Sequence, residues 1–177
     1  MKRHLRTAAP ALVLLLAALL SLGSTRLAAP PQESAGARAR EEAYRANNLG
    51  VALLEQFKHK EGAEQFRRAL ALDPKLSVAR INLAIALFNV PDLDAALAEA
   101  RAAAEAAPRA PQPHYILGLI ARQQNRVEDG AAAFQRVLAS DARDPRANVN
   151  LGQILSQQRK YDEAVTAFRV ALAEEPY

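Results

Sequence analysis

The sequence predicts an all-α protein built as a solenoid of four helix-turn-helix units. One unit runs from Asn47 to Pro74, and its apolar residues recur every three or four positions on both sides of a mostly polar break at 55–60. This spacing is typical of two amphipathic helices. The unit recurs every 34 residues without an insertion. The proline near its end indicates a helix stop, because proline cannot continue the backbone hydrogen bonds of a helix.

The recurring positions can be followed through all four units. The first helix of each unit carries a leucine and a small residue, at Leu49-Gly50, Leu83-Ala84, Leu117-Gly118 and Leu151-Gly152. The matching positions of the second helices are Phe66, Ala100, Phe134 and Phe168. The period and the residue types resemble the tetratricopeptide repeat. The resemblance implies a right-handed superhelical solenoid of four tetratricopeptide helix-turn-helix repeats, at about 43–76, 77–110, 111–144 and 145–177.

Small residues in the first helices predict close contact between the two helices of each hairpin. Glycine inside a helix costs about 1 kcal/mol relative to alanine, so a recurring glycine indicates a packing requirement. Gly50, Gly118 and Gly152 leave room for the partner helix, and the phenylalanines fill the wider gaps. A single hairpin leaves an apolar face uncovered, so we expect the hairpins to stack in a row.

The first forty residues precede the repeats and predict targeting. Three basic residues before position 7 lead into an uninterrupted apolar run, Ala11 to Leu20, about as long as the apolar core of a secretory signal. We expect 1–23 to be a signal peptide cut after Gly23 or, alternatively, a signal anchor that uses residues 7–23. Residues 24–40, which include Pro30-Pro31, are expected to be a flexible linker, with the alternative that Ala37 to Arg40 already extend the first helix. The repeat domain is then 41–177.

Within the first two repeats, turn residues and helix caps predict where the helices begin and end. The first helix is expected to start near Glu41, and its turn lies around 57–59. In repeat two, Asp92 follows Pro91 and can cap the second helix.

Repeats three and four show the same signals. Pro111 and Pro113 fit the first turn of a helix, and the last helix is expected to open near Tyr161. The printed sequence stops just after Pro176 without a further helix. Because repeat arrays need polar ends, we expect either that water is tolerated there or that another chain covers the last helix. The second option predicts a homo-oligomer through the C-terminal helix.

No residue pattern indicates catalysis, a metal or a cofactor. The chain has no cysteine, and its histidines beyond the leader, His59 and His114, form no ligand pair. No glycine-rich phosphate loop is present. The net charge of +4 depends largely on Lys2, Arg3 and Arg6, and without them 20 basic residues face 19 acidic ones. We therefore predict a protein that is not an enzyme and does not bind nucleic acid.

The resemblance implies that the first helix of each repeat lines a concave groove. The partner-binding residues that it predicts are Asn48, Val51, Ile81, Asn82, Ile85, Asn89, Tyr115, Ile116, Leu119, Arg122, Arg146, Asn150 and Gln153. Asparagines in one register can donate to and accept from a peptide backbone. The lysine positions of the chaperone-binding relatives hold Asn47 and Ile81, so recognition of chaperone tails is rejected. Two interpretations of the Ile81, Ile85, Tyr115, Ile116 and Leu119 cluster remain open, a binding patch or ordinary packing.

These expectations combine into one functional hypothesis and an alternative. The protein is predicted to be an interaction scaffold or adaptor that binds a partner peptide or protein in the groove, either exported to the periplasm or outside the cell, or anchored in the inner membrane. The alternative is a structural, self-assembling component of an envelope complex.

Overall fold

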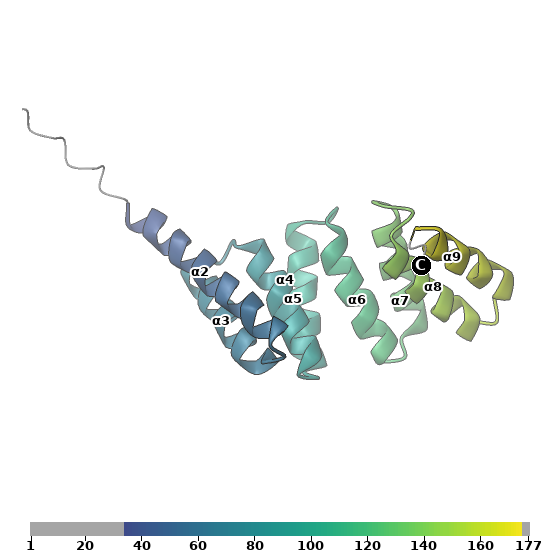
Figure 1. Ribbon diagram of the computed structural model, residues 1–177, viewed down its shortest axis with the longest axis horizontal. Helices are drawn as coiled ribbons and strands as arrows, with labels where there is room; N and C mark the ends of the chain where they lie inside the picture. The colour runs from purple at the N-terminus through teal and green to yellow at the C-terminus, as the bar shows by residue number, and fades with distance from the viewer. Residues whose placement is uncertain (1–33, 175–177) are drawn as a thin grey trace, which may run out of the picture. The chain divides into compact units, whose positions relative to one another are not determined.

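The computed structural model describes residues 34–174, which form eight helices and no strand (Figure 1). The helices are α2 (Ala35–Glu55), α3 (His59–Leu72), α4 (Ser77–Asn89), α5 (Leu93–Ala106), α6 (Pro111–Gln123), α7 (Val127–Leu138), α8 (Pro145–Gln157) and α9 (Tyr161–Glu174). The predicted signal segment 1–23 and residues 24–33 of the predicted linker lie outside the described residues.

Consecutive helices pair into four hairpins, α2 with α3, α4 with α5, α6 with α7 and α8 with α9. The second helix of each hairpin also packs on the first helix of the next, through α3 and α4, α5 and α6, and α7 and α8. Figure 1 shows the hairpins following one another in a single row from α2 to α9. The prediction of an all-α solenoid of four helix-turn-helix repeats is confirmed.

The first helix begins earlier than the sequence predicted. We expected a flexible linker up to residue 40 and a helix start near Glu41, with Ala37 to Arg40 as an alternative extension of the helix, and α2 begins still earlier, at Ala35. Alanine and arginine dominate this stretch and are strong helix formers, so the helix extends about two turns before the first repeat. Residues 35–40 are therefore helical, and that part of the linker prediction is wrong.

Pairs of a small and a large residue set the spacing inside the hairpins. A Cβ atom added to Gly118 would lie 2.7 Å from the ring of Phe134, and one added to Gly50 would lie 2.5 Å from Phe66. The second repeat has alanine at both positions, Ala84 and Ala100, and both are fully buried. Alanine in place of glycine on the first helix is thus accommodated by alanine in place of phenylalanine on the second helix.

Local signals at the helix ends agree with the structure. The Asp92 carboxylate accepts a hydrogen bond from the Ala95 N–H at 3.3 Å and caps α5, as predicted. Asp144 caps α8 by accepting from the Ala147 N–H at 2.8 Å. Proline opens both α6 and α8. The sequence located the starts of α5 and α6 because these signals are local, whereas the Asp144 cap of α8 was not predicted.

Candidate functional site

The predicted partner-binding residues lie on the first helices of the hairpins. They come from α2, α4, α6 and α8, and we call the surface that they form the inner-helix surface. Helix α4 contacts both α2 and α6, and side-chain hydrogen bonds connect α6 with α8. The fold therefore brings the predicted residues into one continuous row.

The part of this surface on α2 and α4 combines apolar side chains with the asparagines Asn48, Asn82 and Asn89. Val51, Ile81 and Ile85 are half-buried and pack against the core of the second hairpin. Val78, on the first turn of α4, is 42% exposed. This end combines a fixed apolar base with an exposed apolar side chain.

Ile116 does not belong to the accessible surface. The repeat register placed it beside Tyr115 and Leu119 as a contact residue, but it is only 4% exposed and lies in the core with Leu83 and Leu87. Tyr115 and Leu119 are half-buried against the core of the last two hairpins. The prediction of Ile116 as a partner contact is wrong, because its side chain packs between the α4 and α6 hairpins.

The asparagines of the inner-helix surface bond to the protein itself. Asn82 Nδ2 donates to Asn47 Oδ1 at 3.0 Å, and Asn47 Nδ2 donates to Asn48 Oδ1 at 3.3 Å. Asn150 Nδ2 donates to the Tyr115 hydroxyl at 3.3 Å and to the Arg146 carbonyl at 2.7 Å. In both cases an asparagine joins its helix to the preceding first helix, so these amides help to hold neighbouring repeats in register.

Two of the predicted residues make hydrogen bonds within the array, one to its own helix and one to the next first helix. Asn89 is exposed and donates to the Ile85 carbonyl of its own helix at 3.0 Å. Arg122 on α6 donates to the Gln153 side chain on α8. Asn48 and Gln153 are exposed and can still reach a partner.

Arginine marks the α6 and α8 end of the surface. The Arg146 guanidinium lies 5.1 Å from the centre of the Tyr115 ring, a cation–π arrangement. It also pairs with Asp144 at 3.3 Å. Arg146 and Arg122 place guanidinium groups at this end, whereas the α2 and α4 end carries aliphatic side chains and asparagines; the Asp144 carboxylate offsets the charge of Arg146.

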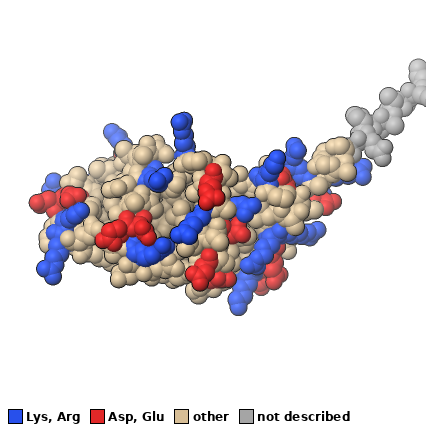
Figure 2. Space-filling view, turned by 180° about the vertical axis from the view of Figure 1, so that it is seen from behind, with Lys and Arg blue, Asp and Glu red and all other residues tan. Residues whose placement is uncertain are grey.

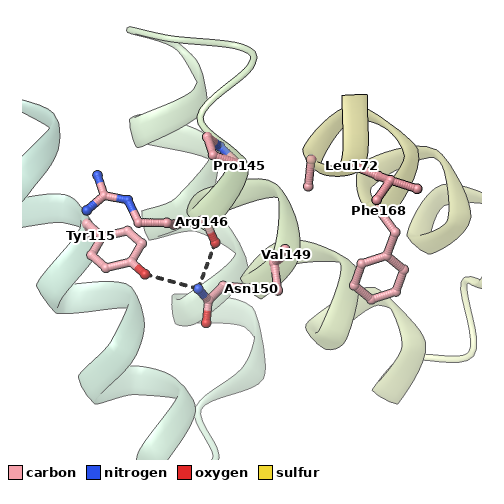
Figure 3. Close-up of a pocket in the computed structure, with 8 residues that line it drawn as sticks. Tyr115, Pro145, Arg146, Val149, Asn150, Phe168 and Leu172 are labelled. Carbon is pink, nitrogen blue, oxygen red and sulfur yellow. Dashed lines mark hydrogen bonds between the residues drawn. The ribbon is translucent and has the colours of Figure 1, made fainter. Parts of the chain in front are cut away.

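A hollow of about 340 Å³ opens beside Arg146 (Figure 3). Tyr115, Arg146 and Asn150 line one side of it, and Phe168 and Leu172 of α9 line the other. Phe168 and Leu172 were not among the predicted site residues. The Phe168 ring fills the space beside Gly152, as the sequence predicted, but it is also 36% exposed, which the repeat register did not indicate. The accessibility of both residues could have been inferred from their position in the last repeat, because no later hairpin among the described residues covers α9.

The described surface shows no concentrated charge and no metal cluster. On the face in Figure 2, acidic and basic side chains are interspersed, without a large patch of either sign. Among residues 34–174 no group of three or more histidine, aspartate or glutamate side chains could hold a metal ion. Within the same range, none of the helices has the length and apolar content needed to cross a bilayer.

A family model described as the tetratricopeptide repeat matches this chain at residues 47–111, 81–145 and 115–177. The three overlapping matches are each shifted by one repeat and together span all four hairpins. The curated proteins include no match to the sequence.

Several solved structures share the fold at low sequence identity. MamA (41-end) from Desulfovibrio magneticus RS-1 is 21% identical, with a TM-score of 0.68, over 76% of each chain. A thermophilic tetratricopeptide repeat protein of Thermus thermophilus is 18% identical, with a TM-score of 0.66, over 74% of this chain and 73% of its own. The first such domain of Spaghetti, bound to the HSP90 peptide SRMEEVD, is 18% identical, with a TM-score of 0.65, over 68% and 95%.

Proposed function

Because this chain belongs to the tetratricopeptide repeat family, we propose that it is an interaction scaffold that binds a segment of another protein along its inner-helix surface. The observation that carries the proposal is the continuous row of exposed and half-buried side chains on α2, α4, α6 and α8, which ends in the hollow beside Arg146. Hydrogen bonds between repeats hold this row in place before a partner arrives, and a pre-organised surface loses less entropy on binding.

The two ends of the surface favour a partner segment with two kinds of side chain. Apolar side chains of the partner would be buried against Val51, Val78 and Ile85, where water is displaced from apolar surface. Acceptor or acidic groups would lie near Arg122 and Arg146. Since Asn82 and Asn150 already donate within the protein, they contribute chiefly to positioning, and exposed amides such as Asn48 and Gln153 are the better candidates for partner contacts.

The Spaghetti domain holds an HSP90 peptide, but the residues here do not favour the same ligand. The chaperone-binding members of the family have lysines at the positions that hold Asn47 and Ile81 in this chain. Asn47 is buried, and its side chain bonds to its neighbours. We therefore propose a different partner segment, whose apolar side chains contribute more to binding than a terminal carboxylate does.

The leader supports a proposal about location. Basic residues followed by the apolar run Ala11–Leu20 favour export, with residues 1–23 removed or kept as a membrane anchor. In either case the scaffold would work at or beyond the inner membrane. Mass spectrometry of the native protein would identify its N-terminus.

Binding can be tested with a variant that places carboxylates on the inner-helix surface. Val78 and Gln112 are exposed and stand one repeat apart, so both occupy the same position on the inner-helix surface. They are the second residues of α4 and α6, where an acidic side chain suits the helix N-terminus. We expect Val78→Asp with Gln112→Asp to weaken binding at least tenfold, since desolvating a carboxylate against an apolar partner is unfavourable. Partners would be captured from native envelopes on the wild-type chain, then purified and titrated calorimetrically.

The matched control adds the same two charges elsewhere. Ala98→Asp with Ala132→Asp places them on the second helices α5 and α7, away from the inner-helix surface. The proposal predicts that this control keeps the wild-type affinity. Equal affinity of both double variants, or a loss with the control alone, would refute the assignment of the binding surface.

A second candidate function is a structural role in which copies of the protein assemble. The observation that favours it is the exposed apolar face of α9, formed by Tyr161, Val165, Phe168 and Leu172.

A further inference from the structure

Helix α9 exposes a face that is covered in the preceding repeat. Tyr161, Val165, Phe168 and Leu172 lie along one side of α9 and are 36–62% exposed. The residues one repeat earlier, Val127, Ala131, Phe134 and Leu138, belong to the core of the last two hairpins, where α7 packs on α8. We call the four residues of α9 the α9 stripe. Its residue types are those of an interior helix contact.

The opposite end of the array is a poor partner for this stripe. If a second copy continued the row, its α2 would take the place that α8 takes against α7. At that contact α8 presents Ala147, Leu151 and Ile154, which are almost fully buried. The equivalent positions of α2 are Arg45, Leu49 and Ala52. The Arg45 side chain is 74% exposed and pairs with Glu41 at 2.6 Å, so continuing the row would bury an arginine where alanine belongs.

The α9 stripe is instead complementary to itself. If two α9 helices pack antiparallel about a two-fold axis between Val165 and Phe168, Tyr161 lies opposite Leu172 of the second copy. Val165 then lies opposite Phe168 of the second copy. Both contacts occur twice, as symmetry requires for an isologous dimer. The stripe itself carries no charged residue, so this pairing buries only apolar side chains and the tyrosine rings.

The charges beside the stripe favour the same arrangement. Asp162 and Arg169 are exposed and lie on one flank of the stripe, one near each end of α9. In an antiparallel pair Asp162 comes close to Arg169 of the second copy, and Arg169 comes close to Asp162 of the second copy. In a parallel two-fold pair this flank of each copy would lie on opposite sides of the contact, so Asp162 and Arg169 of the two copies would not meet and their attraction would be lost. Charge and apolar pattern thus agree on one orientation.

We propose that the protein forms a two-fold dimer in which α9 packs antiparallel against α9 of a second copy. This inference deepens the assembly candidate. Because Phe168 and Leu172 also line the hollow beside Arg146, the dimer would cover that end of the inner-helix surface. One helix pair buries less area than a standard protein interface, so the dimer is weak and concentration-dependent. Pairing by α9 also closes the assembly at two copies, whereas continuation of the row would give open filaments.

Reversing the flanking charges tests the pairing on the full chain without touching the stripe. We expect wild-type protein to change from monomer to dimer with rising concentration in sedimentation velocity experiments. Asp162→Arg alone and Arg169→Asp alone should each weaken dimerisation about tenfold, since each creates two like-charge contacts per dimer. The double reversal, Asp162→Arg with Arg169→Asp, should restore it. Glu163→Lys is the matched control, because it changes an exposed first-turn acid of α9 away from the stripe.

Orientation can be tested separately because the chain has no native cysteine. Tyr161→Cys and Leu172→Cys are exposed changes at the two ends of the stripe. A mixture of the two variants should form disulfide-linked dimers under mild oxidation, and neither variant alone should do so at a comparable rate. Linkage within each single variant indicates parallel pairing and overturns the proposal.

Three further results would overturn the dimer. They are a monomer at every concentration, assemblies larger than two that grow with concentration, and single charge reversals that dimerise like wild type. The scaffold proposal is refuted by a separate result, namely equal partner affinity of the inner-helix double variant and the control double variant.

Discussion

At the scale of single residues, glycine and phenylalanine pairs determine how closely the helices of a hairpin approach. Gly50, Gly118 and Gly152 each face a phenylalanine ring, and a Cβ atom on any of them would lie within 3.0 Å of that ring. Where Ala100 replaces the phenylalanine, Ala84 can replace the glycine. The two positions therefore depend on each other through volume, since protein interiors are close-packed.

Gly118→Ala should lower stability by about 1–2 kcal/mol, because the overlap with Phe134 costs more than the gain in helix propensity. Gly36→Ala is the control, since nothing lies within 4 Å of its added methyl group. It should leave the midpoint of urea unfolding, followed by circular dichroism, unchanged or slightly higher. In a Phe134→Ala background, Gly118→Ala should no longer destabilise, and a persistent loss there would contradict the volume argument.

The asparagines show that residue type alone does not distinguish a peptide-binding role from a structural one. Asn82 and Asn150 occupy the register in which the resemblance implies contact with a bound peptide. In the structure their amides donate to Asn47 and Tyr115 of the preceding first helices. The same amide chemistry suits both roles, and only the neighbouring helix decides between them.

At the scale of helices, capping residues and prolines define most boundaries. The α5 helix begins after Asp92, whose carboxylate satisfies the Ala95 N–H. The start of α2 was predicted six residues late, because the acids at Glu41-Glu42 looked like a helix start. Alanine and arginine upstream carry no stop signal, so the helix continues to Ala35.

Asp92→Ala should reduce stability by about 1 kcal/mol, since it leaves a backbone N–H at the start of α5 without its cap. Asp94→Ala removes a first-turn acid that does not cap the helix and should cost less. Thermal unfolding of both variants, monitored at several concentrations, checks the difference. Equal losses would show that the carboxylate acts through its charge near the helix end rather than through the hydrogen bond.

At the scale of the whole molecule, position in the row decides how well each repeat is protected. Residues in the middle of the row, such as Leu83 and Ile120, are buried from both sides. The α9 stripe is packed from one side only. Because each repeat contacts only its neighbours, stability is shared between repeats and interfaces and falls towards an incompletely covered end.

Hydrogen exchange should reveal this gradient. In dilute protein, where the proposed dimer dissociates, backbone amides of α9 should exchange at least tenfold faster than those of α4 and α6, because α9 can open without disrupting a second interface. Mass spectrometry of exchanged peptides measures each helix. Uniform protection from α2 to α9 would mean that the row unfolds as one unit and would contradict this expectation.

The sequence by itself determined the repeat period, the all-α class and several helix ends, among them the Asp92 cap of α5 and the proline start of α6. These features depend on local patterns, since apolar spacing, caps and prolines act within a few residues. A periodic pattern assigns the same role to every copy of a position, so it cannot predict differences in burial between repeats. Ile116 and Phe168 show the limit, because one is more buried and the other more exposed than the register implies.

Only the tertiary structure decided which residues of the inner-helix surface are free to meet a partner and which face of the array is left uncovered. Burial depends on the hairpin next in the row, and that neighbour differs between the middle and the end. The asparagine bonds between repeats, the hollow beside Arg146 and the α9 stripe all arise from these differences. Non-local packing therefore decides which side chains are accessible on the surface that the sequence outlined.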